Sequence, residues 1–196
     1  MNYLVVGGGS GIGKKVVENL ALVGHQVFAA SRNITEANLP PSVEAISYDV
    51  LADDNLDILP EVLDGLVYCP GSINLKLFHR IKASDFQAEW DLNFMGAVKV
   101  TQAVLDRLKK SDAASVVYFS TVAVQLGLPF HSSISAAKGA LEGLTRSLAA
   151  EYAPKIRFNA IAPSLTDTPL AENLLSNDKK REANAERNPL KLIGQP

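Results

Sequence analysis

A glycine-rich stretch near the N-terminus, residues 7–13, places the strongest constraint on how this chain folds. It follows the apolar run 3–6, which is typical of a short buried strand, and it precedes residues 14–20, which are typical of the start of a helix. Such a turn exposes backbone N–H groups at the positive end of a helix dipole, where an anion such as a pyrophosphate is stabilised. Glycine permits the close approach and, where the turn needs it, a positive φ. A plain tight turn is the alternative, which the rest of the pattern disfavours.

The composition limits the class of protein. The chain has 196 residues, which suits a single domain over 1–196 with a core of its own. The net charge of −2 gives no reason to expect nucleic acid or an anionic membrane as a partner. The single cysteine, Cys69, excludes an internal disulfide and fits a reducing compartment, so we expect a cytoplasmic protein. Strand-like residues begin directly after Met1 and no apolar run is long enough to span a bilayer, so we expect neither a signal peptide nor a membrane helix.

Apolar strands alternate with helices along the chain. This pattern predicts a doubly wound parallel sheet of the Rossmann type, with helices on both faces in three α/β/α layers. Ligands bind beyond the carboxyl ends of the strands in such sheets. The further strands are expected at 26–31, 43–48, 65–68, 115–119 and 156–161, and long helices at 84–110 and 132–152.

Ser31 and Arg32 follow the second predicted strand, where a dinucleotide fold places the adenosine ribose. An acidic residue there would hold the ribose hydroxyls of NAD and repel the additional phosphate of NADP. Arginine instead pairs with phosphate through two hydrogen bonds. We therefore expect NADP(H) to be favoured over NAD(H), with an ordinary surface arginine as the alternative.

Asp49 and Val50 end the third predicted strand. The carboxylate is suited to accept a hydrogen bond from the adenine amino group while Val50 lies against the ring. The carboxylate is equally suited to cap a helix that begins with residues 51–53, and the two roles can coexist.

The segment Cys69, Pro70 and Gly71 follows the fourth predicted strand. Its small residues would let the chain pass close to a cofactor. We interpret Cys69 as a small buried residue rather than as a nucleophile.

With these features the chain resembles the short-chain dehydrogenase/reductase family over residues 2–169. Gly7, Gly11 and Gly13 match its Thr-Gly-x-x-x-Gly-x-Gly motif, although a valine replaces the threonine. Segment 68–71 keeps only the glycine of the family's Asn-Asn-Ala-Gly, and segment 163–168 is similar to its Pro-Gly-x-x-x-Thr. The resemblance implies a cofactor site formed by Gly7, Ser10, Gly11, Ile12, Gly13, Ser31, Arg32, Asp49, Val50, Cys69, Pro70, Gly71, Lys138, Pro163, Thr166 and Thr168.

The resemblance also implies catalytic roles for Asn93, Thr121 and Lys138. Asn93 matches the asparagine that supports the active site, and Thr121 stands at the spacing of the catalytic serine. Lys138 matches the lysine of the family's Tyr-x-x-x-Lys pair, which holds the nicotinamide ribose. By the same likeness Thr168 would bind the nicotinamide carboxamide. No metal ion is expected.

The pattern departs from the family at Ile134, four residues before Lys138, where the proton-donating tyrosine is expected. Residues four apart share a helix face, and isoleucine has no proton to give. A positioned general acid contributes roughly 10²–10⁴-fold in rate. Substitutes for it are His131, Ser135 or a water held by Lys138, while His131 also suits a structural hydrogen bond.

Two neighbouring serines, Ser132 and Ser133, are interpreted as caps of the helix that follows.

Two functions follow from these observations. The first is an NADP(H)-dependent oxidoreductase that transfers hydride to or from a carbonyl or alcohol substrate through a rebuilt proton relay. The second is an NADP(H)-binding sensor or scaffold of the same fold that has lost turnover. We favour the first.

Two features concern the outer surfaces. Small residues at 136, 140, 143 and 147 form a stripe that lets another helix approach or that packs on the protein's own sheet. Because the family dimerises through its two long helices, we expect a homodimer or homotetramer. Residues 166–196 are polar and occupy the place of the family's substrate lid, although their composition equally fits a plain exposed helix and loop. The family's last helix and strand have no counterpart before residue 196, which fits either a partial chain or an open sheet edge.

Overall fold

A parallel β-sheet of six strands forms the centre of the computed structural model, which describes residues 1–52 and 55–196. The order across the sheet is β3-β2-β1-β4-β5-β6, so the direction of winding reverses between β1 and β4. This confirms the predicted doubly wound sheet. The strands are β1 (Asn2–Val6), β2 (Gln26–Ser31), β3 (Val43–Ser47), β4 (Gly65–Tyr68), β5 (Ala114–Phe119) and β6 (Ile156–Ile161).

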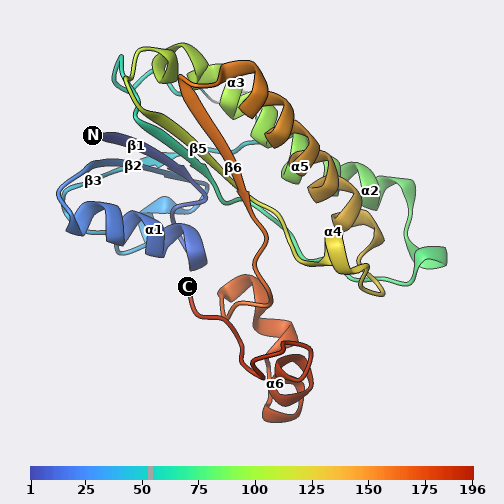
Figure 1. The fold of residues 1–196 in the computed structure, drawn as a ribbon. Coiled ribbons are helices and arrows are strands. Elements are labelled where there is room, and N and C mark those ends of the chain that lie inside the picture. The colour runs from blue at the N-terminus through green and yellow to red at the C-terminus, as the bar shows by residue number, and fades with distance from the viewer. Residues whose placement is uncertain (53–54) are drawn as a thin grey trace.

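Helices cover both faces of the sheet and give the three expected layers (Figure 1). Helix α1 (Gly11–Leu22) packs on one face, where Val5, Val17 and Val27 form a small core. Helices α3 (Gly96–Lys109) and α5 (Ser132–Tyr152) pack on the other face over the larger core. Shorter elements connect them: η1 (Ile34–Glu36), η2 (Phe78–Arg80) and α4 (Ala123–Leu126).

The long helix expected over 84–110 contains a wider π-helical turn. It consists of α2 (Ala83–Trp90), η3 (Asp91–Met95) and α3. The N–H of Gly96 bonds to the carbonyl of Asp91, five residues back, and so leaves the carbonyl of Leu92 free. The hydroxyl of Tyr68 donates to that carbonyl at 2.6 Å, and a side chain on Gly96 would collide with this hydroxyl. A residue from β4 therefore stabilises the wide turn that carries Asn93.

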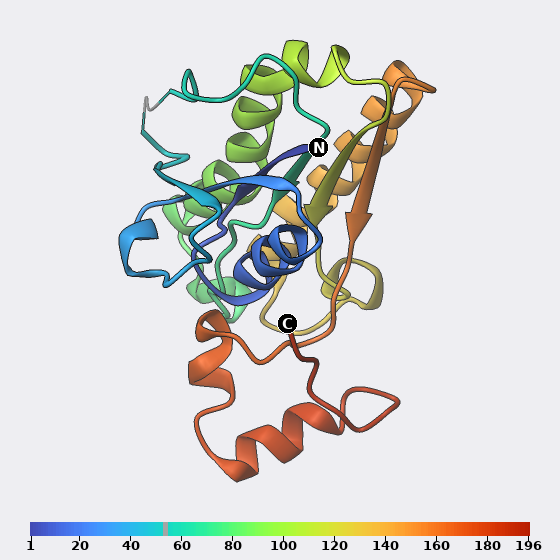
Figure 2. The same cartoon turned by 90° about the vertical axis from the view of Figure 1, so that its left-hand side faces the viewer.

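Residues 166–196 fold beyond the carboxyl ends of the strands and include η4 (Pro169–Leu174) and α6 (Asp178–Ala185). The two ends of this segment meet, because Thr166 and Gly194 form a parallel bridge. The N–H of Asp167 donates to the carbonyl of Gly194 at 2.8 Å. Figure 2 shows the segment below the sheet, with the C-terminus returning toward its start.

Several local expectations differ from the structure. Helix α1 begins at Gly11, so part of the glycine stretch already belongs to the helix. Ser132 and Ser133 lie inside the first turn of α5, and their buried hydroxyl oxygens have no hydrogen-bond partner; the predicted capping is wrong, since His131 occupies the cap position. A side-chain carboxylate oxygen of Asp49 accepts a hydrogen bond from the N–H of Leu51 at 3.0 Å and stabilises a turn instead of a helix.

Asp53, which the predicted helix after Asp49 would include, lies outside the described residues. Strand β6 pairs only with β5 in the part of the chain that the structure describes. Over residues 1–52 and 55–196, none of the helices combines the length and the apolar character that crossing a membrane requires.

Candidate active site

The turn between β1 and α1 depends on glycine at two kinds of position. Gly7 and Gly11 have φ values of +79° and +50°, which side-chain-bearing residues rarely adopt. A Cβ on Gly13 would collide with the carbonyl oxygen of Gly7, so only glycine lets the helix start this close to the strand. The first α1 hydrogen bond runs from the N–H of Lys14 to the carbonyl of Ser10, which leaves the preceding N–H groups without a partner inside the helix. Such a cradle suits a diphosphate.

A pocket of about 540 Å³ opens at the carboxyl ends of the strands and gathers most of the predicted site. It lies between the glycine turn, the segment after β4, the start of α5 and residues 163–192. The predicted site residues that line it are Gly7, Ser10, Gly11, Ile12, Gly13, Arg32, Cys69, Pro70, Gly71, Thr121, Lys138, Pro163, Thr166 and Thr168.

Four predicted residues do not line this pocket within the described chain: Ser31, Asp49, Val50 and Asn93. The hydroxyl of Ser31 lies against Gly9, where a Cβ would approach to 2.7 Å. Val50 is buried and lines a second pocket instead. Asn93 is fully buried behind the pocket floor. The structure thus separates residues that surround the pocket from residues that support it.

Helix α5 carries Ile134 and Lys138, the two positions where proton transfer is expected from the sequence; they lie one turn apart and both line the pocket. Burial lowers the pKa of Lys138 from its usual 10.5 to about 8, while neighbouring Cys69 and Glu89 act in the opposite direction. Thr121 also lines the pocket, and its hydroxyl oxygen accepts from the N–H of Ala123 at 3.3 Å. The hydroxyl proton of Thr121 is therefore available to a ligand.

The other candidate proton donors are less well placed. His131 lines the pocket, but one ring nitrogen lies 2.7 Å from the carbonyl oxygen of Pro129, which is the structural hydrogen bond weighed as its alternative. Ser135 is not among the described residues that line the pocket. Ser120, next to Thr121, lines the pocket, but its hydroxyl donates to the carboxylate of Glu142 at 2.6 Å. Burial raises the pKa of the Cys69 thiol to about 12, which keeps it protonated and agrees with a non-nucleophilic role.

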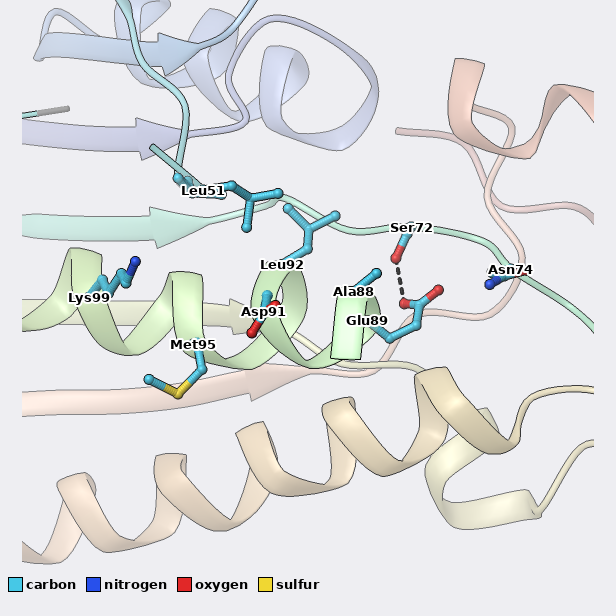
Figure 3. Close-up of a pocket in the computed structure, with 10 residues that line it drawn as sticks. Leu51, Ser72, Asn74, Ala88, Glu89, Asp91, Leu92, Met95 and Lys99 are labelled. Atoms are coloured by element: carbon cyan, nitrogen blue, oxygen red, sulfur yellow. Dashed lines mark hydrogen bonds between the residues drawn. The ribbon is translucent and has the colours of Figure 1, made fainter. Parts of the chain in front are cut away.

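Sequence reasoning missed a buried polar cluster behind the pocket floor. Glu89, on α2, accepts hydrogen bonds from the hydroxyl of Ser72 at 2.5 Å and from the amide nitrogen of Asn93 at 2.8 Å. The spacing of four between Glu89 and Asn93 was the only available signal, because Ser72 comes from a different segment. Figure 3 shows Glu89 directed at Ser72 along the wall of the second pocket.

The pocket also receives side chains from the C-terminal segment that no motif identifies. Asn184, Arg187, Asn188 and Leu192 line it, and Asn188 donates to the hydroxyl of Ser164 at 3.3 Å. A Cβ on Gly11 would lie 3.2 Å from the side chain of Thr168, so this segment passes directly over the glycine turn. No group of three or more His, Cys, Asp or Glu side chains is arranged to hold a metal ion among residues 1–52 and 55–196.

Comparison with known proteins agrees with this geometry. The short chain dehydrogenase family model matches residues 2–179. L-xylulose reductase of Bos taurus is 33% identical over 201 residues, which cover 95% of this chain and 80% of that protein. A tropinone reductase homolog of Arabidopsis thaliana is 31% identical over 212 residues, covering 100% of this chain and 81% of the homolog.

Solved structures give the same result. A short chain dehydrogenase family protein from Francisella tularensis subsp. tularensis SCHU S4 superposes with a TM-score of 0.91 at 26% identity, covering 100% of this chain and 86% of the other. The chain therefore belongs to the short-chain dehydrogenase/reductase family, whose members are oxidoreductases that bind nicotinamide cofactors and act on small molecules.

Proposed function

We propose that the protein is an NADP(H)-dependent oxidoreductase acting on a carbonyl or alcohol group of a small molecule. The observation that carries this proposal is the joint presence of the glycine turn, Arg32, Thr121 and Lys138 around one pocket. When bound, the cofactor supplies or accepts the hydride. The chain's own residues bind it, orient the substrate and exchange the proton.

The residues around the pocket suit separate parts of the cofactor. The free N–H groups at the start of α1 suit the diphosphate, and the guanidinium of Arg32 suits the 2′-phosphate. Asp49 and Val50 would contact the adenine, and Lys138 would hold the nicotinamide ribose. Thr168 would bind the carboxamide, which is supported by its position next to Gly11.

We infer that Ile134 takes the place of the family's tyrosine. A different group must therefore exchange the proton with the substrate in this chain. Reduction of a carbonyl adds a hydride to carbon and a proton to oxygen. Lys138 is suited to give that proton, since a buried lysine with a pKa of about 8 is mostly protonated at neutral pH and is still acidic enough to release it. The hydroxyl of Thr121 would donate a hydrogen bond to the same oxygen.

Two measurements test the proposal. Calorimetry with NADPH and NADH measures binding, and the loss of NADPH absorbance measures turnover on a panel of ketones, aldehydes and quinones that includes L-xylulose and tropinone. We expect NADPH to bind and at least one carbonyl compound to be reduced. Absence of heat with both coenzymes would overturn the assignment.

The competing function is an NADP(H)-binding sensor or scaffold without turnover, which the aliphatic side chain of Ile134 favours. The variant Ile134→Tyr separates the two functions. If the unmodified protein binds NADPH but reduces nothing, and Ile134→Tyr creates activity, the sensor function is correct. If the unmodified protein already turns over, we expect the added phenol to raise the rate, by up to roughly 10²–10⁴-fold.

Assembly, lid and location complete the proposal. The small residues Ala136, Ala140, Gly143 and Ser147 lie on the outer side of α5, and a Cβ on Gly143 would meet nothing within 4 Å. This open surface supports a homodimer or homotetramer formed through the long helices.

Residues 166–196 would act as the lid over the substrate. The single cysteine supports a cytoplasmic location.

A further inference from the structure

Glu89 is a buried carboxyl group that none of the roles above uses. Only 3% of its surface is exposed, and it stands on α2 between the candidate active site and the second pocket, which has a volume of about 710 Å³. Buried carboxylates are rare in proteins unless they are paired and hydrogen-bonded. Figure 3 shows its carboxylate directed at Ser72, a residue that lines both pockets, so Glu89 is placed to act on the candidate active site.

The contacts of Glu89 fix the orientation of the Asn93 amide. The amide nitrogen of Asn93 donates to the Glu89 carboxylate at 2.8 Å, to the Glu89 backbone carbonyl at 3.0 Å and toward the Ser72 hydroxyl at 3.0 Å. The amide oxygen of Asn93 consequently points the other way, and it has no partner although it is buried. This oxygen and the Lys138 ammonium nitrogen lie 3.4 and 3.8 Å from the position that a Cβ on Gly71 would occupy.

Glu89 is the neighbouring group that can offset the positive charge of the Lys138 ammonium. Cys69 and Glu89 are the two neighbours that favour the charged lysine. The Cys69 thiol has a pKa of about 12 and is neutral where Lys138 titrates. Asp91 and Lys99 line the outer pocket with Glu89, but the Asp91 carboxylate is bound to the Gln87 amide at 2.7 Å.

We propose that Glu89 is a positioning residue of the active site, which turns the carbonyl oxygen of Asn93 toward Lys138 and keeps Lys138 in its ammonium form. This inference rests on the proposed function, in which Lys138 exchanges the proton with the substrate. It also gives the site a carboxylate that influences the protonation of Lys138, in a chain where Ile134 carries no phenol.

The experiment is a direct titration of Lys138 by NMR of lysine-labelled full-length protein, with the signal assigned by its loss in Lys138→Met. We expect a midpoint near pH 8 in the unmodified protein. In Glu89→Gln the midpoint should fall by about one unit, because an opposite charge nearby favours the ammonium. Glu89→Asp keeps the charge and should restore most of the shift, which a purely structural role would not predict.

Asp91→Asn is the matched control, since it removes a carboxylate that lies two residues after Glu89 and lines the same outer pocket. In this variant the titration midpoint of Lys138 should equal that of the unmodified protein. An unchanged midpoint in folded Glu89→Gln would overturn the proposal. If Glu89→Gln fails to fold, the double variant Glu89→Gln with Lys138→Met should regain the folded circular dichroism spectrum, because the uncompensated ammonium is gone. A double variant as unfolded as the single one would count against the proposal equally.

The titration needs no cofactor, so its outcome is independent of the proposed function. If neither coenzyme binds the unmodified protein, the oxidoreductase assignment fails while the link between Glu89 and Lys138 is still measured. If NADPH binds, the pH dependence of its affinity should shift in Glu89→Gln in the same direction as the NMR midpoint. A cofactor pH profile that stays fixed while the midpoint moves would show that Glu89 does not act on the site through Lys138.

Discussion

At the scale of single residues, Lys138 shows how burying an ammonium group lowers the stability of the fold. Its side chain is 6% exposed, and burial lowers its pKa to about 8. Between about pH 8 and 10.5 the unfolded chain binds a proton that the folded protein has released, so the free energy of unfolding rises with pH across this window. Below pH 8 the destabilising cost of burying the ammonium is fully present.

Replacing this lysine tests that balance. Lys138→Met should raise the free energy of unfolding at pH 7 by on the order of 2–3 kcal/mol, because the buried charge is removed. The gain should shrink toward zero as pH approaches 10.5, where the unfolded lysine is also half neutral. Urea unfolding at both pH values measures the difference, and an equal gain at each would contradict the assigned cause.

Arg32 is the residue that we propose to select NADPH over NADH. Its side chain is exposed and lines the pocket. Arg32→Ala should weaken NADPH binding about tenfold or more and leave NADH binding unchanged, because only NADPH has the phosphate that this guanidinium would bind. Calorimetry measures both affinities. Arg157→Ala removes an exposed arginine on β6 that does not line the pocket, and it should alter neither affinity.

At the scale of elements, the turn from β1 to α1 and the π-helical turn η3 are the two places where backbone geometry builds the site. The first depends on local sequence, so the glycine spacing predicted it. The second depends on the hydroxyl of Tyr68, which donates to the carbonyl of Leu92, 24 residues later in the chain. Gly96 has no side chain and so leaves room for this hydroxyl. Short-range patterns give strands and helices, but they do not reveal a bond between distant side chains.

Gly13→Ala tests the first of these turns. The new methyl group would collide with the carbonyl oxygen of Gly7, so the turn must open. We expect the free energy of unfolding to fall by about 1–3 kcal/mol and NADPH affinity to fall more than tenfold. Gly139→Ala, in helix α5, is the control, because its methyl group would make only an ordinary contact with Val124 at 3.7 Å and alanine favours a helix by about 0.8–1 kcal/mol.

The same contrast explains what sequence reasoning recovered of the site. Residues that follow strands, such as Arg32 and Thr121, were identified because parallel strands end at one edge of the sheet. Glu89 was missed because its contacts with Ser72 and Asn93 form only when two separate segments meet. Ser132 and Ser133 were wrongly interpreted as caps because α5 begins one residue earlier than a serine cap requires.

At the scale of the whole molecule, the outer face of α5 is the surface that we propose for self-association. Gly143→Arg should convert the expected dimer or tetramer to monomers, because a long charged side chain would separate two closely packed helices. It should leave the fold unchanged, since no neighbour occupies that space. Light scattering measures the mass and circular dichroism the fold. A monomeric unmodified protein would contradict the assembly.

The closed C-terminal segment has a consequence for how molecules reach the pocket. Thr166 and Gly194 tie its beginning to its end, and Arg181 is paired with Asp167 at 2.7 Å, so the segment is attached to the sheet through one narrow stem (Figure 2). If this segment acts as the proposed lid, we expect its pocket-lining side chains to move together. Entry and departure of a substrate would then depend on one movement of the whole segment, and a covalent crosslink between this segment and the glycine turn that it contacts at Gly11 would trap any molecule already bound.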